Sequence, residues 1–267
     1  IPNMGELNEK FRKITNITLI NGDYTTYHGG GALFIYLSSL AKVLIPFQSD
    51  CSDLAGNNWV AFPKLPEIKD VSSIEGAPSK YAAYFDGSAG MRTNSVNDNP
   101  KIAENKPFRF SVDFYVPSSV GMTTNDEMPW TIFGDEYYGS PVCTLFTGVS
   151  KHKLYADTSS NSNMAAISGT KNYSWPNTEI IFDENVGDFT DKWWHFEINR
   201  GKDNVSTFIL NGTTYKLQTR LAGSIGNASF AFCIGREHSG ANNFKGYLAN
   251  LSLYELDYKT SAGGKIY

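Results

Sequence analysis

The sequence predicts an all-β protein in which antiparallel strands form a sandwich. Charged residues make up 19% of the chain and aromatic residues 14%, and there are 24 glycines. Few charges, many aromatic residues and many turn formers are typical of sheets joined by tight turns. Short strand patterns separated by turn signals at regular spacing indicate a sandwich, and no segment of the main body has a sustained helical period.

Length and charge exclude some classes of protein. A chain of 267 residues buries roughly 73% of its extended surface on folding, enough for a core without disulfides. The formal net charge of −4 argues against a nucleic-acid binder, which normally carries a basic stripe. The three cysteines, Cys51, Cys143 and Cys233, are far apart and odd in number. They fit small buried hydrophobes, or one disulfide plus a free thiol.

No targeting or membrane-inserted segment is expected. Residues 1–15 carry several charges, unlike the apolar core of a signal peptide. The longest apolar stretch, residues 32–47, is interrupted by two serines and a lysine and is too short to span a bilayer. An isoleucine in place of an initiating methionine indicates a processed or trimmed chain.

Residues 1–42 are predicted to form an N-terminal arm rather than a domain. The segment combines a short alternating pattern, three glycines at 29–31 and an apolar run that periodicity cannot assign to strand or helix. Its apolar residues need a partner surface, and strand addition to a sheet edge would supply one. These docking residues are Phe11, Ile14, Leu33, Phe34, Ile35 and Leu37.

Residues 43–256 are predicted to form the sandwich, and residues 257–267 a frayed polar tail. The clearest strand patterns are 108–116 and 194–199, where apolar and polar residues alternate as in a half-buried strand. Asn211-Gly212 between 205–210 and 213–217 is a strong hairpin signal. The other predicted strands are 43–47, 81–86, 130–133, 143–149, 180–182, 228–235 and 245–256.

Four groups of short motifs occur in order along the main body. They are VLIPF (43–47) with DLAGNNW (53–59); AYFDGS (83–88); WWHF (193–196) with FILNG (208–212); and CIGR (233–236) with FKGYL (244–248). In this order they resemble the concanavalin A-like lectin/glucanase superfamily, specifically laminin-G-like domains of the kind found in bacteriophage structural proteins. The resemblance implies a jelly-roll sandwich. It identifies a scaffold rather than a function, because glycan lectins, glycosidases, lyases, adhesion modules and virion proteins share it.

Catalytic signatures are missing from the sequence. A glycosidase of this superfamily would carry Glu-x-Asp-x-x-Glu on one strand, because one carboxyl protonates the leaving oxygen while another attacks or activates water. No such motif occurs, and Glu197 alternates on its strand with Asn199, not a second carboxylate, as its same-face neighbour. A lyase site would need a cluster such as His195, Arg200 and Tyr215, but a solvent-facing strand histidine is the simpler interpretation. No nucleophile elbow, Walker A motif or His-x-x-x-His pair occurs. The chain is therefore predicted not to be an enzyme.

Calcium is the one metal for which the sequence offers candidates, since it prefers carboxylate, amide and carbonyl oxygens. The densest acidic loop contributes Asp183, Glu184 and Asp188, although a solvated acidic loop is the simpler interpretation. Glycan binding would use loop aromatics against sugar C–H groups, with amides and charges for the hydroxyls. The candidate glycan-binding residues are Trp175, Tyr173, Tyr137, Tyr138, Arg236 and Asn242.

These observations favour a non-enzymatic binding protein. The first hypothesis is a virion component, such as a capsid decoration, fibre or tail protein, whose arm docks on other virion proteins or on neighbouring copies. Its sandwich would be displayed toward host-surface glycans, and a multi-copy or homo-oligomeric state is expected. The alternatives are a secreted carbohydrate-binding adhesin, and a glycan-active hydrolase or lyase with an unrecognised site. The expected locations are the virion or the extracellular surface.

Overall fold

The computed structural model describes residues 41–104, 106–122, 130–134, 146–150, 153–157, 165–168, 188–201, 206–216, 224–227, 230–238, 240 and 243–256. The predicted docking residues of the arm lie outside these ranges, and so does the predicted tail.

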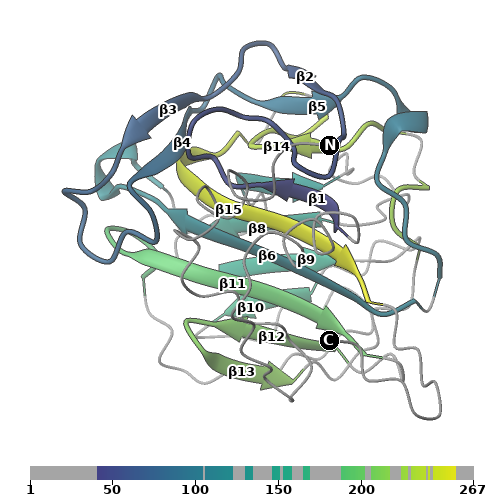
Figure 1. Cartoon of the computed structure of the whole chain (residues 1–267). Helices are drawn as coiled ribbons and strands as arrows, with labels where there is room; N and C mark the ends of the chain where they lie inside the picture. The colour runs from purple at the N-terminus through teal and green to yellow at the C-terminus, as the bar shows by residue number, and fades with distance from the viewer. Residues whose placement is uncertain are drawn as a thin grey trace, which may run out of the picture.

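Two antiparallel sheets form the sandwich, which confirms the predicted fold class (Figure 1). The front sheet has the order β13-β12-β11-β6-β15-β4-β3, and β1 also pairs with β15. Its strands are β1 (Ala41–Ile45), β3 (Glu67–Asp70), β4 (Tyr81–Asp86), β6 (Phe108–Tyr115), β11 (Trp193–Arg200), β12 (Ser206–Leu210), β13 (Thr213–Lys216) and β15 (Lys245–Glu255).

The back sheet has the order β10-β9-β8-β7-β14-β5-β2. Its strands are β2 (Trp59–Ala61), β5 (Met91–Thr93), β7 (Trp130–Gly134), β8 (Phe146–Ser150), β9 (Lys153–Asp157), β10 (Ala165–Ser168) and β14 (Cys233–Ile234). Two 3-10 turns, Val96–Asp98 and Ser118–Val120, are the only helical elements in the described ranges. No helix in this part of the chain is long and apolar enough to cross a membrane.

The core lies between the sheets and is built largely of phenylalanine. Alternate residues of β6 and β11 point into it, and Phe110, Phe114 and Phe196 are fully buried. Burial of each such ring contributes about 1.5–3 kcal/mol. Arg200, at the end of β11, is also fully buried. Its Nε donates to the Lys106 carbonyl at 2.7 Å, and burial lowers the pKa of the guanidinium to about 10.

Two of the sequence motifs act as turns that join strands. Asp53 accepts four hydrogen bonds, and they link β1 to the start of β2. In the predicted Asn211-Gly212 hairpin both residues have positive φ, 46° and 82°, as a two-residue turn between β12 and β13 requires.

The structure also corrects parts of the strand prediction. The short strands β2, β3, β5, β9 and β10 were not predicted, and the predicted strand 228–235 is reduced to Cys233–Ile234 within the described ranges. Strands of three to five residues are too short to show a clear periodicity. Cys51 is a free thiol, and burial is the main cause that raises its pKa to about 11. Cys233 is fully buried, as predicted for a small hydrophobe. Cys143 lies outside the described residues.

Candidate functional site: a charged row on the outer face of the front sheet

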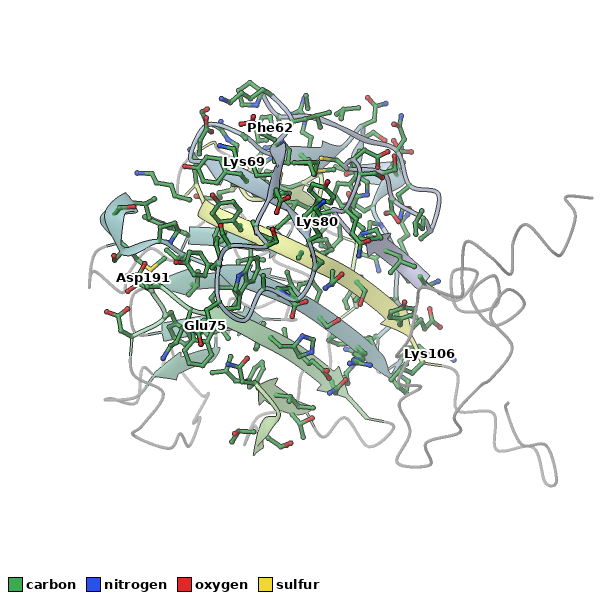
Figure 2. The ribbon with its side chains drawn as sticks, turned by 60° about the vertical axis from the view of Figure 1, so that its left-hand side comes forward. Phe62, Lys69, Glu75, Lys80, Lys106 and Asp191 are labelled. Carbon is green, nitrogen blue, oxygen red and sulfur yellow. The ribbon has the colours of Figure 1, made fainter. Side chains whose placement is uncertain are left out.

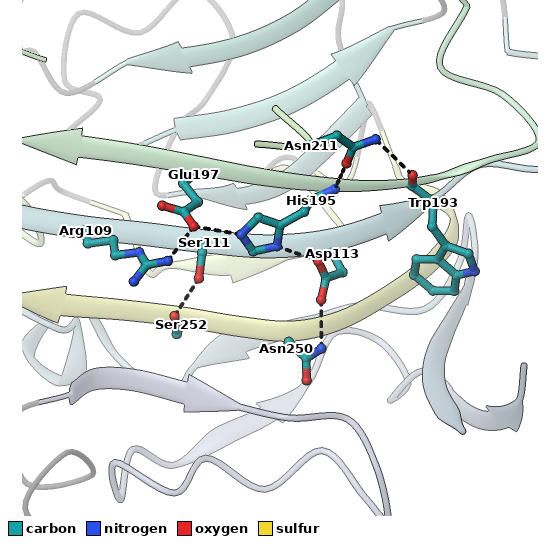
Figure 3. A network of polar contacts seen from close by, with 9 residues as sticks. All are labelled: Arg109, Ser111, Asp113, Trp193, His195, Glu197, Asn211, Asn250 and Ser252. Atoms are coloured by element: carbon teal, nitrogen blue, oxygen red, sulfur yellow. Dashed lines mark hydrogen bonds and ion pairs between the residues drawn. The ribbon is translucent and has the colours of Figure 1, made fainter. Parts of the chain in front are cut away.

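Strands β6, β11 and β15 bring a row of polar side chains together on the face of the front sheet that points away from the core (Figure 3). The β6–β11 register places Asp113 opposite His195 and Ser111 opposite Glu197. We call these side chains the polar row; its members are Arg109, Ser111, Asp113, His195, Glu197, Asn250 and Ser252.

His195 is the centre of the polar row. Its Nδ1 lies 2.6 Å from Asp113 Oδ1, and its Nε2 lies 2.8 Å from Glu197 Oε1. Burial lowers the pKa of the imidazole, but the hydrogen bonds and charges of the two carboxylates outweigh it and raise that pKa to about 9. At neutral pH the ring is therefore an imidazolium that donates from both nitrogens, and it has no lone pair with which to act as a base.

Glu197 is held between two cations. Its Oε1 accepts from Arg109 Nη2 as well as from His195. Burial raises the pKa of the carboxyl, but His195 and Arg109 together lower it below its ordinary value. The row is thus an alternation of positive and negative groups in which Glu197 stays ionised. A glycosidase acid needs the opposite, a carboxyl whose pKa is raised.

Asn250 closes the row from β15. The β6–β15 register shifts between Ala249 and Ser252, and at this bulge Asn250 has a φ of 50°. Bulges of this kind re-aim side chains. Here Asn250 Nδ2 donates to Asp113 Oδ2 at 2.7 Å, so both oxygens of that carboxylate have a partner. Beside it, the hydroxyls of Ser111 and Ser252 are 2.8 Å apart.

An aromatic shelf, formed by Tyr84, Tyr115, Trp193 and Tyr247, adjoins the polar row. Tyr84 and Tyr247 have ring centroids 4.9 Å apart, and Tyr115 and Trp193 have centroids 5.6 Å apart. The β3–β4 loop packs on the shelf through apolar residues that include Val71 and Ile74. Figure 2 shows this loop, with Glu75 and Lys80, in front of the sheet. The three tyrosines of the shelf are all half-buried, whereas Trp193 is buried.

Only two of the residues predicted from sequence as sites are described. Arg236 Nη1 donates to the Ser88 carbonyl at 2.9 Å and Nη2 to the Gly240 carbonyl at 3.1 Å. Asp188 Oδ1 accepts from the backbone and the hydroxyl of Thr190. The remaining predicted residues lie outside the described ranges: Tyr137, Tyr138, Tyr173, Trp175, Asp183, Glu184 and Asn242.

No group of three or more metal-ligating side chains with suitable geometry occurs within the described ranges. The calcium loop stays a prediction, because Asp183 and Glu184 are not among those residues.

The structure also corrects the sequence analysis of the front sheet. Glu197 is not isolated: His195, two residues earlier on the same strand, contacts it, and pairing with β6 adds Arg109 and, through His195, Asp113. Arg200, considered with His195 and Tyr215 as a lyase cluster, is fully buried at the end of β11 and does not lie in the polar row. The sequence did show the outward-facing polar residues of 108–116, which include three members of the polar row. It did not show that this strand pairs with 193–200.

The chain shares its fold with toxin binding domains. It is similar to the binding domain of Paraclostridial Mosquitocidal Protein 1, with 13% identity, a TM-score of 0.55, and coverage of 83% of this chain and 50% of that one. It is also similar to the Botulinum Neurotoxin serotype G binding domain, with 12% identity, a TM-score of 0.51, and coverage of 81% and 48%. The chain therefore spans about half the length of each of these two toxin domains.

A looser match is to domain 4 of AbnA, a GH43 extracellular arabinanase from Geobacillus stearothermophilus, solved in complex with arabinotriose. It has 16% identity and a TM-score of 0.49, with coverage of 80% of this chain and 92% of that one. No protein-family model matches the chain, and no curated protein matches its sequence. The two toxin matches establish a shared β-sandwich; the laminin-G branch and the phage origin stay predictions.

Proposed function

We propose that this chain is a non-enzymatic carbohydrate-binding module and that the outer face of the front sheet holds the sugar. The observation that carries the proposal is the polar row lying directly beside the aromatic shelf. Sugars present hydroxyls around an apolar C–H face, so their recognition uses fixed charged and amide groups next to aromatic rings. The polar row supplies the charged and amide groups and the shelf supplies the rings, on neighbouring positions of β6, β11 and β15.

The chemistry of the row supports binding over hydrolysis. Its charges are fixed in advance by one another, so a ligand hydroxyl meets ordered donors and acceptors that need no rearrangement. The side chain of His195 is 40% exposed, which leaves the centre of the row open to a ligand. Glu197 is held ionised and so lacks the proton that the general acid of glycoside cleavage donates, and the protonated His195 ring has no lone pair with which to act as a base. The two toxin matches are themselves described as binding domains, which agrees with this proposal.

A glycan array with paired variants tests the proposal. Tyr84→Ala removes a ring of the shelf and Asn199→Ala removes an amide that faces Glu197 at 3.5 Å. Tyr81→Ala and Asn97→Ala are matched controls, because both side chains are exposed and lie off this face. We expect a specific hit that either site variant weakens at least tenfold and neither control changes. Binding that survives both site variants, or release of reducing sugar from the bound glycan, would refute the proposal.

We also propose, from the sequence, what kind of assembly carries the module. The DLAGNNW motif at 53–59 resembles phage structural proteins, and the apolar residues of 1–42 need a partner surface. We therefore propose that the arm docks the sandwich on a virion or a similar multi-copy assembly, with the secreted adhesin as the alternative. Light scattering of the full chain and of a chain lacking residues 1–40 distinguishes the two. Assembly should depend on the arm, whereas an adhesin would be equally monomeric in both forms.

A further inference from the structure

A second cluster of charges lies at the other sheet and takes no part in the polar row. Arg92, in the middle of β5, stands between the buried Met91 and Thr93, so its side chain lies on the outer face of the back sheet. Arg236 follows β14, which pairs with β5. The two guanidinium carbons lie 4.6 Å (Arg92) and 5.1 Å (Arg236) from the ring centroid of Phe62.

The backbone leaves room for this arrangement at Gly90. A Cβ placed there would lie 2.7 Å from both Cγ and Cδ of Arg236, so any other residue would displace the arginine. Gly90 precedes Arg92 by two positions and pairs with Phe62, whose N–H donates to the Gly90 carbonyl at 2.9 Å. The absence of a side chain at this one position thus lets Arg236 lie beside Arg92 over a shared ring.

Neither arginine has an anionic partner among the residues that the structure describes. Arg236 bonds only backbone carbonyls, of Ser88 and Gly240, and no described carboxylate forms an ion pair with either guanidinium. The Nε atoms of both arginines are buried and have no hydrogen-bond partner in the described part of the chain. A buried charged donor without a partner costs stability, and two neighbouring cations repel each other.

His238 adds a third group to the cluster. Its ring packs against Phe230 with centroids 4.5 Å apart and an interplanar angle of 42°, and its Nδ1 is buried without a described partner. Burial, and then the positive charge of Arg92, lower the pKa of this histidine. The nearest acid, Glu237, opposes that effect, but it already has interactions of its own.

We propose that Arg92, Arg236 and His238 form a binding site for an oxyanion group, a sulfate or a phosphate. Three nitrogens without a described partner, Arg92 Nε, Arg236 Nε and His238 Nδ1, belong to side chains grouped around Phe62 and Phe230, and the two guanidinium charges have no ion-pair partner among the described residues. Guanidinium groups with free donors are the groups that hold a tetrahedral oxyanion. Phe62 provides the apolar wall on which both guanidiniums rest. Such a group can arrive as the free inorganic ion or as a substituent of a sulfated glycan. The site lies on the opposite sheet from the proposed sugar face, so it does not depend on that proposal.

Isothermal titration calorimetry with the full chain tests the site, with sodium sulfate, sodium phosphate and a sulfated tetrasaccharide as probes at matched ionic strength. The key variant is Arg92→Gln, because Arg236 also bonds the backbone and its loss would disturb the fold. Lys101→Gln is the control, since it removes an equal charge at an exposed position. We expect saturable binding that Arg92→Gln weakens at least tenfold and Lys101→Gln leaves unchanged.

The choice of probe identifies the source of the oxyanion. A tetrasaccharide that binds at least tenfold more tightly than free sulfate supports a sulfated glycan, while equal affinities support the free ion. No binding of any probe, or equal binding by wild type and Arg92→Gln, would overturn the proposal. Arg92→Gln should still bind the glycan-array hit of the front sheet, so failure of one site is distinguishable from failure of the other.

Discussion

His195 Nδ1 lies 2.6 Å from Asp113 Oδ1, although the two residues are 82 positions apart in the chain. The contact exists because β6 and β11 pair antiparallel with these two residues directly opposite. Together with the contact to Glu197, it keeps the His195 ring protonated at neutral pH, and the other side chains of the polar row lie around that positive charge.

The first prediction concerns pH. The pKa of His195 is raised to about 9, above its ordinary value of 6.5. A raised folded-state pKa stabilises the fold fully below pH 6.5, and this stabilisation is lost as the pH rises toward 9. Because the side chain is 40% exposed, solvent screening limits the effect to about 1 kcal/mol. Urea unfolding between pH 6 and pH 10 should show the decline in the wild type and a flatter profile in His195→Gln. Equal slopes in the two proteins would contradict the assignment.

The second prediction concerns Glu197, which joins the two cations of the row. Glu197→Gln keeps the shape of the side chain but leaves Arg109 and His195 with one carboxylate fewer. We expect a loss of about 1–3 kcal/mol in the free energy of unfolding, as for a hydrogen bond to a charged group. The pKa of His195, followed by NMR of the imidazole protons, should fall toward its ordinary value. Glu67→Gln, at an exposed position of β3, serves as the control and should change neither quantity.

The third prediction separates two contributions of Asn250 to stability, its backbone conformation and its side-chain hydrogen bond. Its φ of 50° favours asparagine or glycine, and its amide bonds Asp113. Asn250→Gly relieves the backbone and loses only the hydrogen bond, whereas Asn250→Ala loses the bond and adds strain. We expect the alanine variant to be less stable than the glycine variant by about 1 kcal/mol in denaturant unfolding. If the Asn250→Ala variant were the more stable of the two, the assignment of a left-handed backbone conformation to residue 250 would be contradicted.

The sequence predicted more of the scaffold than of the site. Alternation in 108–116 and 194–199 gave the correct inner and outer faces, and Asn211-Gly212 gave the correct hairpin, because both signals are local. The polar row is not local: Asp113 and His195 meet only through strand pairing, and periodicity does not indicate which strands pair. The bulge that aims Asn250 leaves no mark in the alternation either. Short strands such as β5, which carries Arg92, contain too few residues to show a period.

The last prediction concerns Asp53, the first residue of the DLAGNNW motif. Asp53 Oδ1 accepts from the N–H groups of Leu44 and Ala55, at 2.9 Å and 2.8 Å. Its Oδ2 accepts from Asn57 Nδ2 at 2.7 Å and Trp59 Nε1 at 2.8 Å.

Asp53→Asn places an amide N–H₂ against donors in either orientation, so at least two donors lose their acceptor. The expected loss is about 2–4 kcal/mol in the free energy of unfolding. Asp50→Asn is the matched control, because Asp50 is exposed and, within the described part of the chain, accepts from the Ser52 N–H alone. Urea unfolding of both variants measures the difference. A loss at Asp53 no larger than at Asp50 would show that the motif does not fasten β1 to β2.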